Sequence, residues 1–134
     1  MALRDEITGA WRLMRWETRA ADGSVSLPYG EDLTGLLLFT ASGYMSGQIM
    51  LPESEPIEPA PAVVAGPQRY IAYCGPFHLD ESNMRLTTRV QASVARSWVG
   101  TDQVRDVELE GDTLVLRPPR RPSGEQGVLT WRRL

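Results

Sequence analysis

The sequence predicts an all-β protein in which about eight antiparallel strands close into a barrel around an internal cavity. Short segments of alternating or continuous apolar residues recur along the chain, and residues typical of turns separate them. No segment has the periodicity of a long helix, so no helix layer is expected to cover the sheet. A sandwich of two sheets is the alternative, but a closed barrel leaves no exposed strand edge and keeps room for one small ligand.

The first half of the chain contains predicted strands at residues 7–18, 25–28, 35–40 and 44–50. The first mixes aromatic and β-branched residues with charges, which favours a strand with two different faces. The third is a continuous apolar run, and the turn at residues 41–43 reverses the chain after it. In the fourth, Tyr44, Ser46 and Gln48 share one face, and we expect this polar face to line the cavity.

Residues 51–67 interrupt the strand pattern with five prolines and three acidic residues. Proline cannot donate to a strand ladder, so this segment is expected to lie outside the sheet. Two interpretations stay open: a lid at the cavity mouth, or a disordered acidic excursion.

The second half contains predicted strands at residues 69–79, 84–91, 103–109, 113–117 and 128–134. The segment at 84–91 alternates cleanly, with Met84, Leu86, Thr88 and Val90 on one face. Residues 97–100 interrupt the pattern, and residues 110–112 form a strong hairpin turn. At 134 residues, the whole chain is expected to fold as a single domain, residues 1–134.

Composition excludes several classes of function. The net charge is −3 and no basic patch is present, so neither nucleic acid nor a membrane is expected as a partner. All 14 basic residues are arginines, so no lysine is available for covalent amine catalysis. One cysteine and one histidine cannot form a disulfide or an ordinary zinc site, and no metal or other cofactor is expected. Without a leader-like or spanning segment, the chain is predicted to be cytoplasmic, as a monomer or homodimer.

Five polar residues at alternating strand positions are the candidates for the cavity wall: Tyr44, Gln48, Tyr73, Gln103 and Arg105. Their hydrogen-bonding groups would orient a carbonyl or carboxylate against an apolar wall. We assign catalytic roles to Tyr44, Tyr73 and Arg105, and substrate binding to Gln48 and Gln103. The alternative is that Gln103 and Arg105 satisfy one another and neighbouring carbonyls as a buried polar network.

Other residues carry weaker hypotheses. Arg15 lies on the face of Trp11 if the first strand is regular, which would place an Arg15–Glu17 ion pair in the cavity; a bulge or solvated charges are the alternative. Cys74 is expected to be a small buried thiol. His78 is interpreted as a strand-end residue, with proton transfer as the alternative role.

Several segments resemble known barrel proteins. Gly9-Ala10-Trp11-Arg12-Leu13 and Leu129-Thr130-Trp131-Arg132-Arg133 resemble the Gly-x-Trp start and the late arginine of lipocalin-type barrels. The resemblance to the short bacterial and fungal lipocalin-like domain family extends to further segments: Tyr29-Gly30-Glu31-Asp32, Gly43-Tyr44-Met45-Ser46, Tyr70-Ile71-Ala72-Tyr73-Cys74-Gly75, and Trp98-Val99-Gly100-Thr101 through Gln103 and Arg105.

This resemblance implies a calycin-like barrel in which Trp11 plugs one end and Arg132 or Arg133 lies over its ring. It also implies that a small hydrophobic or carbonyl-bearing molecule binds inside, with Trp11, Arg15 and Trp98 among the binding residues. Related barrels serve as carriers and as cofactor-free cyclases in natural-product assembly, and fold alone does not fix function.

Two main hypotheses for function follow. In the preferred one, the barrel is a cofactor-independent cyclase or isomerase, such as a pericyclase, acting on an apolar polyketide-like substrate in specialised-metabolite biosynthesis. The alternative is a non-catalytic carrier or sensor of a small hydrophobic ligand. A third hypothesis, a protein-interaction module, uses Met14 and Trp16 on the outer surface.

Overall fold

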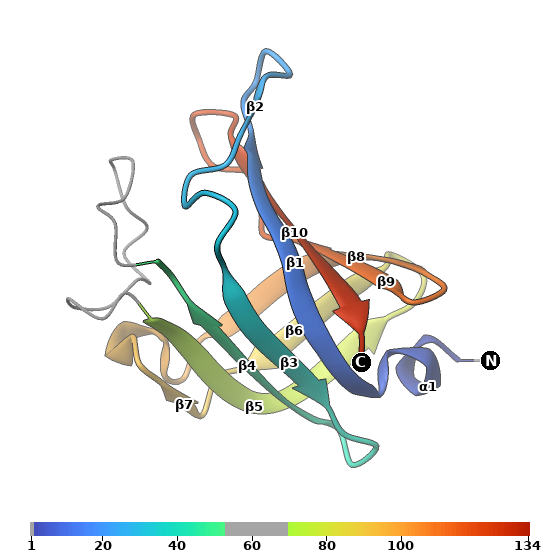
Figure 1. The fold of residues 1–134 in the computed structure, drawn as a ribbon. Helices are drawn as coiled ribbons and strands as arrows, with labels where there is room; N and C mark the ends of the chain where they lie inside the picture. Colours follow the sequence, from blue (N-terminus) through green and yellow to red (C-terminus); the bar gives the residue numbers. More distant parts are fainter. Residues whose placement is uncertain (1, 53–69) are drawn as a thin grey trace.

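Eight antiparallel strands form the body of the protein, which is known here from a computed structural model that describes residues 2–52 and 70–134. They are β1 (Gly9–Arg19), β3 (Thr34–Phe39), β4 (Tyr44–Met50), β5 (Tyr70–Asp80), β6 (Arg85–Arg89), β8 (Asp102–Glu110), β9 (Thr113–Arg117) and β10 (Gln126–Arg133). The strand order is β10-β9-β8-β6-β5-β4-β3-β1, and β1 also pairs with β10 (Figure 1). This pairing closes the predicted barrel.

Four short elements complete the described chain: α1 (Leu3–Ile7), β2 (Val25–Ser26), β7 (Ala92–Ser93) and the 3₁₀ turn η1 (Arg96–Trp98). The β2 strand pairs with β1, and β7 pairs with β5. The predicted strand at 25–28 is therefore present but only two residues long. Apart from Leu51 and Pro52, the proline-rich segment predicted at 51–67 lies outside the described residues.

The interior is filled by apolar side chains from every strand of the barrel. The buried hydrophobic residues of β3 to β9 are Leu37, Phe39, Met45, Ile49, Ile71, Phe77, Leu86, Val107, Leu114 and Leu116. Phe39 and Phe77 meet edge to face, with ring centroids 5.2 Å apart. The predicted alternation is confirmed within β6, because Leu86 and Thr88 are buried while Arg85 and Arg89 are exposed. Met84, which was predicted on the same face as Leu86, precedes the strand and is exposed.

The α1 helix lies beside the end of β10 (Figure 1) and helps to fill that end of the barrel. Its Ile7 is fully buried, and the Ile7 carbonyl accepts a hydrogen bond of 2.9 Å from the indole nitrogen of Trp11. Trp11 is also fully buried, and the guanidinium carbon of Arg133 lies 4.3 Å from its ring centroid. Arg133 further donates to the carbonyls of Glu6 and Thr8. The expected Trp11 plug is confirmed, with Arg133 as the covering arginine.

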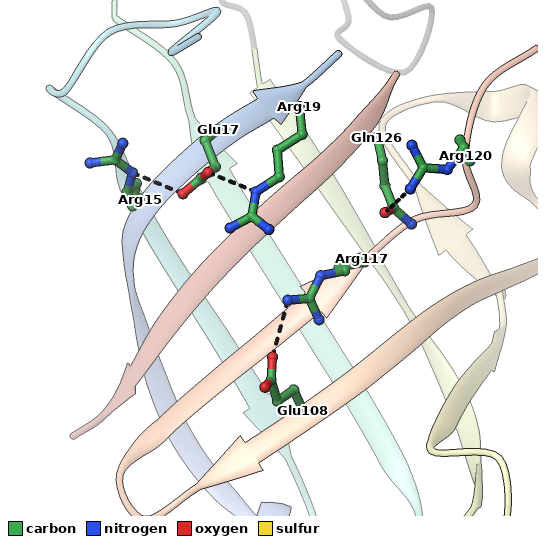
Figure 2. A network of polar contacts seen from close by, with 7 residues as sticks. All are labelled: Arg15, Glu17, Arg19, Glu108, Arg117, Arg120 and Gln126. Carbon is green, nitrogen blue, oxygen red and sulfur yellow. Dashed lines mark hydrogen bonds and ion pairs between the residues drawn. The ribbon is translucent and has the colours of Figure 1, made fainter. Parts of the chain in front are cut away.

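A β-bulge at Met14 divides β1 into two segments with opposite inward phase. Leu13 pairs with Trp131 of β10, but the next pair joins Arg15 to Thr130, so Met14 has no partner in the β1–β10 register. Trp16 therefore points inward, whereas the Arg15 side chain is 52% exposed. The expectation of an inward Arg15–Glu17 pair is wrong: Glu17 lies on the opposite face from Trp16, held between Arg15 and Arg19 (Figure 2).

The inward face of β4 is the apolar one. Met45 and Ile49 are buried, whereas Tyr44 is 49% exposed and Gln48 is exposed as well. The expectation that Tyr44 points into the cavity is therefore wrong, whereas Gln48, although exposed, is among the residues that border the cavity. Met45 is paired with Phe39 of the neighbouring strand β3, and both side chains belong to the core. The polar side chains of β4 keep their contact with water.

Candidate ligand-binding site

The barrel contains a cavity of about 240 Å³ that lies farther along β1 than Trp11. Its lining includes Trp16 but not Trp11, so the cavity and the plugged end are separate parts of the barrel. Most of the lining is apolar and comes from all parts of the sheet: Trp16, Leu37, Gly47, Ile49, Ile71, Leu116, Pro118, Pro119, Leu129 and Trp131. Such a chamber suits a molecule whose body is apolar.

Four residues bring polar groups to one side of the cavity: Tyr73 of β5, Trp98 of η1, and Gln103 and Arg105 of β8. We call these four residues the polar wall. Tyr73 and Trp98 meet edge to face with centroids 5.2 Å apart, and the Arg105 guanidinium carbon lies 5.9 Å from the Trp98 ring centroid. Five of the eight predicted site residues therefore border the cavity: the four of the polar wall and Gln48 of β4.

Hydrogen bonds hold the polar wall to the turn that carries Trp98. The Gln103 amide donates to the Thr101 hydroxyl (3.1 Å), which donates in turn to the Trp98 carbonyl (2.6 Å). Arg105 donates to the Val104 carbonyl at 2.8 Å. Gln103 and Arg105 are not hydrogen-bonded to each other, so this half of the structural alternative is wrong, but the bond from Arg105 to a neighbouring carbonyl agrees with its other half. Both side chains are positioned by their neighbours and border the cavity.

Trp131 of β10 brings to the cavity lining a polar group that is unpaired within the described chain. The residue is 3% exposed, and its indole nitrogen has no hydrogen-bond partner among the described residues. A buried N–H without a partner costs about 1 to 3 kcal/mol, so an acceptor brought by a ligand would recover part of that free energy. Trp131 and Trp16 are cavity residues that the sequence reasoning missed, although the alternation of Trp131 with Leu129 was available as a signal.

The loop after β9 borders the cavity with Pro118, Pro119 and Arg121. The Arg121 guanidinium lies 3.5 Å from the Glu125 carboxylate, and both side chains are nearly half exposed. The same loop is braced by Arg120, which donates to Gln126 (Figure 2) and to the Gly124 carbonyl. Arg121 was not among the predicted site residues, because the sequence places it in a surface loop.

The remaining predicted residues lie away from the cavity interior. Tyr44 and Arg15 point to the outside, and Trp11 belongs to the plug. Gln48 borders the cavity, but its residue is exposed and its side-chain oxygen accepts a hydrogen bond from the Tyr70 hydroxyl. The hypothesis of an outer interaction surface fails for Trp16, which is buried, while Met14 is 48% exposed.

Cys74 and His78 lie on the face of β5 opposite Tyr73. His78 is exposed, and Cys74 is partly buried rather than fully buried as expected.

Hydrogen bonds from Ser24 lower the pKa of Asp22, and hydrogen bonds from Asn83 lower the pKa of Asp80. Neither carboxyl borders the cavity, so these shifted groups belong to turns.

The described residues show neither a metal-binding cluster nor a membrane-spanning helix. Within 2–52 and 70–134, no cluster of three or more histidine, cysteine or acidic side chains is arranged to hold a metal ion. No helix in this part of the chain combines the length and apolar character needed to cross a membrane.

Comparisons with known proteins add to this geometry. A family profile described as a lipocalin-like domain matches residues 8–134. A 77-residue region is 35% identical to the 4'-hydroxy-3'-methoxypropiophenone carrier protein ppsC of Aspergillus oryzae (strain ATCC 42149 / RIB 40), and covers 50% of this chain and 69% of that protein. Two crystal structures of mutants of the fluorescent protein UnaG match with a TM-score of 0.46, at 11% and 13% identity, over 96% and 97% of both chains.

Proposed function

The chain belongs to the lipocalin-like domain family, and on this basis we propose that it carries one small, mainly apolar molecule inside its barrel. The observation that carries the proposal is the polar wall, which sets Tyr73, Trp98 and Arg105 against an otherwise apolar cavity. An apolar body would fill the chamber while an oxygen-bearing head met the hydroxyl, amide and guanidinium groups.

The cavity volume limits the size of the ligand. An apolar cavity of about 150 Å³ holds one benzene molecule, so about 240 Å³ corresponds to a single substituted ring. The relative named as a carrier takes, by its name, a propiophenone that bears hydroxyl and methoxy groups. A ligand of that class, an aromatic ketone, matches both the volume and the polar wall. We therefore propose aromatic carbonyl compounds as the ligand class.

A cofactor-free cyclase or isomerase acting on a polyketide-like substrate is the second candidate. Arg105 favours it, because a guanidinium beside an apolar chamber would stabilise an oxyanion that develops on a carbonyl. Tyr73 is the neighbouring group that would donate or accept a proton. Tyr44 has no part in this version of the hypothesis, because it lies on the outside.

A cytoplasmic location is also part of the proposal, since the single cysteine fits a reducing compartment.

The test is a titration with 4'-hydroxy-3'-methoxypropiophenone followed by tryptophan fluorescence, because Trp16, Trp98 and Trp131 all border the cavity. Arg105→Met should weaken binding about ten- to a hundredfold, as expected for losing a hydrogen bond to a charged group. The matched control is Arg85→Met, which removes an exposed outer arginine of β6 that pairs with Asp106 of β8, and should leave affinity unchanged.

Mass spectrometry of the ligand after incubation separates the two candidates. A carrier returns the ligand unchanged, whereas a catalyst converts it to an isomer or a cyclised product that Arg105→Met should form at least about a hundredfold more slowly. Absence of any fluorescence change with this and related aromatic ketones would contradict the proposal, as would equal affinities of the wild type and Arg105→Met.

A further inference from the structure

Arginine supplies all the formal charge on the described residues that border the cavity. Two arginines line the cavity, Arg105 within β8 and Arg121 in the loop after β9, and no aspartate or glutamate is among the described lining residues. The two cations differ in their surroundings. Arg121 lies 3.5 Å from Glu125 near the surface, so its charge is already countered and screened by water.

Arg105 has no ion pair with any acid in the described part of the chain. Three acids of the same strand, β8, form ion pairs with other arginines: Asp102 pairs with Arg89, Asp106 with Arg85, and Glu108 with Arg117 (Figure 2). The Arg105 guanidinium instead contacts a neutral carbonyl, that of Val104, and the ring of Trp98.

The elements packed around Arg105 offer no counter-charge either. The adjacent strands β6 and β9 contribute Leu86, Thr88 and Leu116 to the interior, and none of these residues is charged. Tyr73 is the other titratable side chain on the polar wall, and Arg121 adds a second positive charge at the loop. A guanidinium in such surroundings stabilises a negative charge more strongly than it would in water.

We propose that the cavity takes its ligand as an anion, formed from a weakly acidic molecule such as a phenol or an enol, with Arg105 as the counter-ion. This inference rests on the proposed function, because it concerns the ligand of the same cavity. The ligand changes only at its O–H bond. That bond breaks, the electron pair stays on oxygen, and the proton leaves to solvent. Binding therefore lowers the pKa of the ligand.

Two probes of nearly equal shape test the proposal: 4-nitrophenol, whose phenolate absorbs at longer wavelength than the phenol, and 4-nitroanisole, its methyl ether, which cannot ionise. The wild type should bind 4-nitrophenol at least about tenfold more tightly than the ether when the pH exceeds the pKa of the free phenol. Below that pKa, the bound probe should show the phenolate band, and its affinity should fall about tenfold per pH unit as the competent anion becomes scarce.

Two variants complete the experiment. Arg105→Met should bind both probes equally and show no phenolate band, while Arg105→Lys keeps the charge and should keep the preference for 4-nitrophenol. The pH series on the wild type needs no variant, so it decides the question even if Arg105→Met fails to fold. Equal affinity for both probes, with no phenolate band, would overturn the inference and leave the proposed carrier intact. Failure of both probes to bind would instead count against the proposed function.

Discussion

Two buried indoles of the barrel differ in what their nitrogens meet. The Trp11 nitrogen donates to the Ile7 carbonyl at 2.9 Å, whereas the Trp131 nitrogen has no partner among the described residues. Both residues are at most 3% exposed, so burial does not distinguish them. The comparison isolates the free energy of one N–H group, because the same substitution removes a satisfied donor at one site and an unsatisfied donor at the other.

We expect Trp131→Phe to change the free energy of unfolding by less than about 1 kcal/mol, since relief of the unpaired donor offsets the lost volume. Trp11→Phe is the matched control: it loses similar volume but orphans the Ile7 carbonyl, and should cost about 1 to 3 kcal/mol more. Urea unfolding of both variants measures the difference. Equal losses would mean that the Trp131 nitrogen is as well satisfied as that of Trp11. Trp131→Phe should also weaken binding of an oxygen-bearing ligand.

At the level of elements, the sequence predicts strands well where each face has one chemistry. Leu86, Thr88 and Val90 alternate with charged or polar residues in the 84–91 segment, and the structure buries all three. The inward phase of Gln103 and Arg105 was predictable for the same reason, because Val107 continues their face into the core. In β6 only one phase buries apolar residues without burying charge, and in β8 the other phase would turn Asp102, Asp106 and Glu108 inward.

The sequence does not predict the inward face of a strand when both faces carry large residues. Trp11, Leu13, Met14 and Trp16 span both phases of a regular strand, so the pattern alone does not locate the bulge at Met14. Register with β10 locates it, and this partner is more than a hundred residues away in the chain. Tyr44 was misplaced for a different reason: a polar face was assumed to serve a ligand, although burying the alternate apolar face stabilises the fold more.

Close packing around β5 gives a prediction at the same scale. A Cβ atom added at Gly75 would lie 2.0 Å from the Arg89 carbonyl oxygen, which is a backbone atom and cannot swing away. Gly75→Ala should therefore separate β5 from the chain at residues 89–91 and destabilise the protein by several kcal/mol, at least about 3, or prevent folding.

The matched control is Gly127→Ala in β10, whose added Cβ would meet its nearest atom at an ordinary 3.6 Å. This variant should change stability by less than about 1 kcal/mol. Thermal unfolding by circular dichroism compares the two. A Gly75→Ala protein that melts at the wild-type temperature would show that the backbone of this junction has more room than the structure gives it.

At the level of the whole molecule, Arg133 joins three parts of the plugged end. It covers the Trp11 ring, donates to two carbonyls at the end of α1 and just beyond, and lies 3.4 Å from Asp112 in the β8–β9 turn. Its neighbour Arg132 is exposed and has no ion pair among the described residues. Adjacent arginines on one strand therefore offer a direct comparison of an inward and an outward guanidinium.

We expect Arg133→Met to cost roughly 2 to 3 kcal/mol, from lost hydrogen bonds to a charged group and the lost cation–π contact. Arg132→Met should stay within about 0.5 kcal/mol of the wild type. Urea unfolding followed by circular dichroism measures both. Similar small losses for the two variants would mean that α1 and Trp11 close the barrel end without help from Arg133.

The pairing of β1 with β10 also governs how the barrel is made on the ribosome. Synthesis proceeds from the N-terminus at about 5 to 20 residues per second, so β1 waits several seconds for the strand that covers its second edge. In that interval the nascent chain exposes two unpaired strand edges and the rings of Trp11 and Trp16. Unpaired edges and exposed apolar rings promote aggregation and are bound by chaperones. Only when residues 126–133 have left the exit tunnel does the first strand gain its last partner.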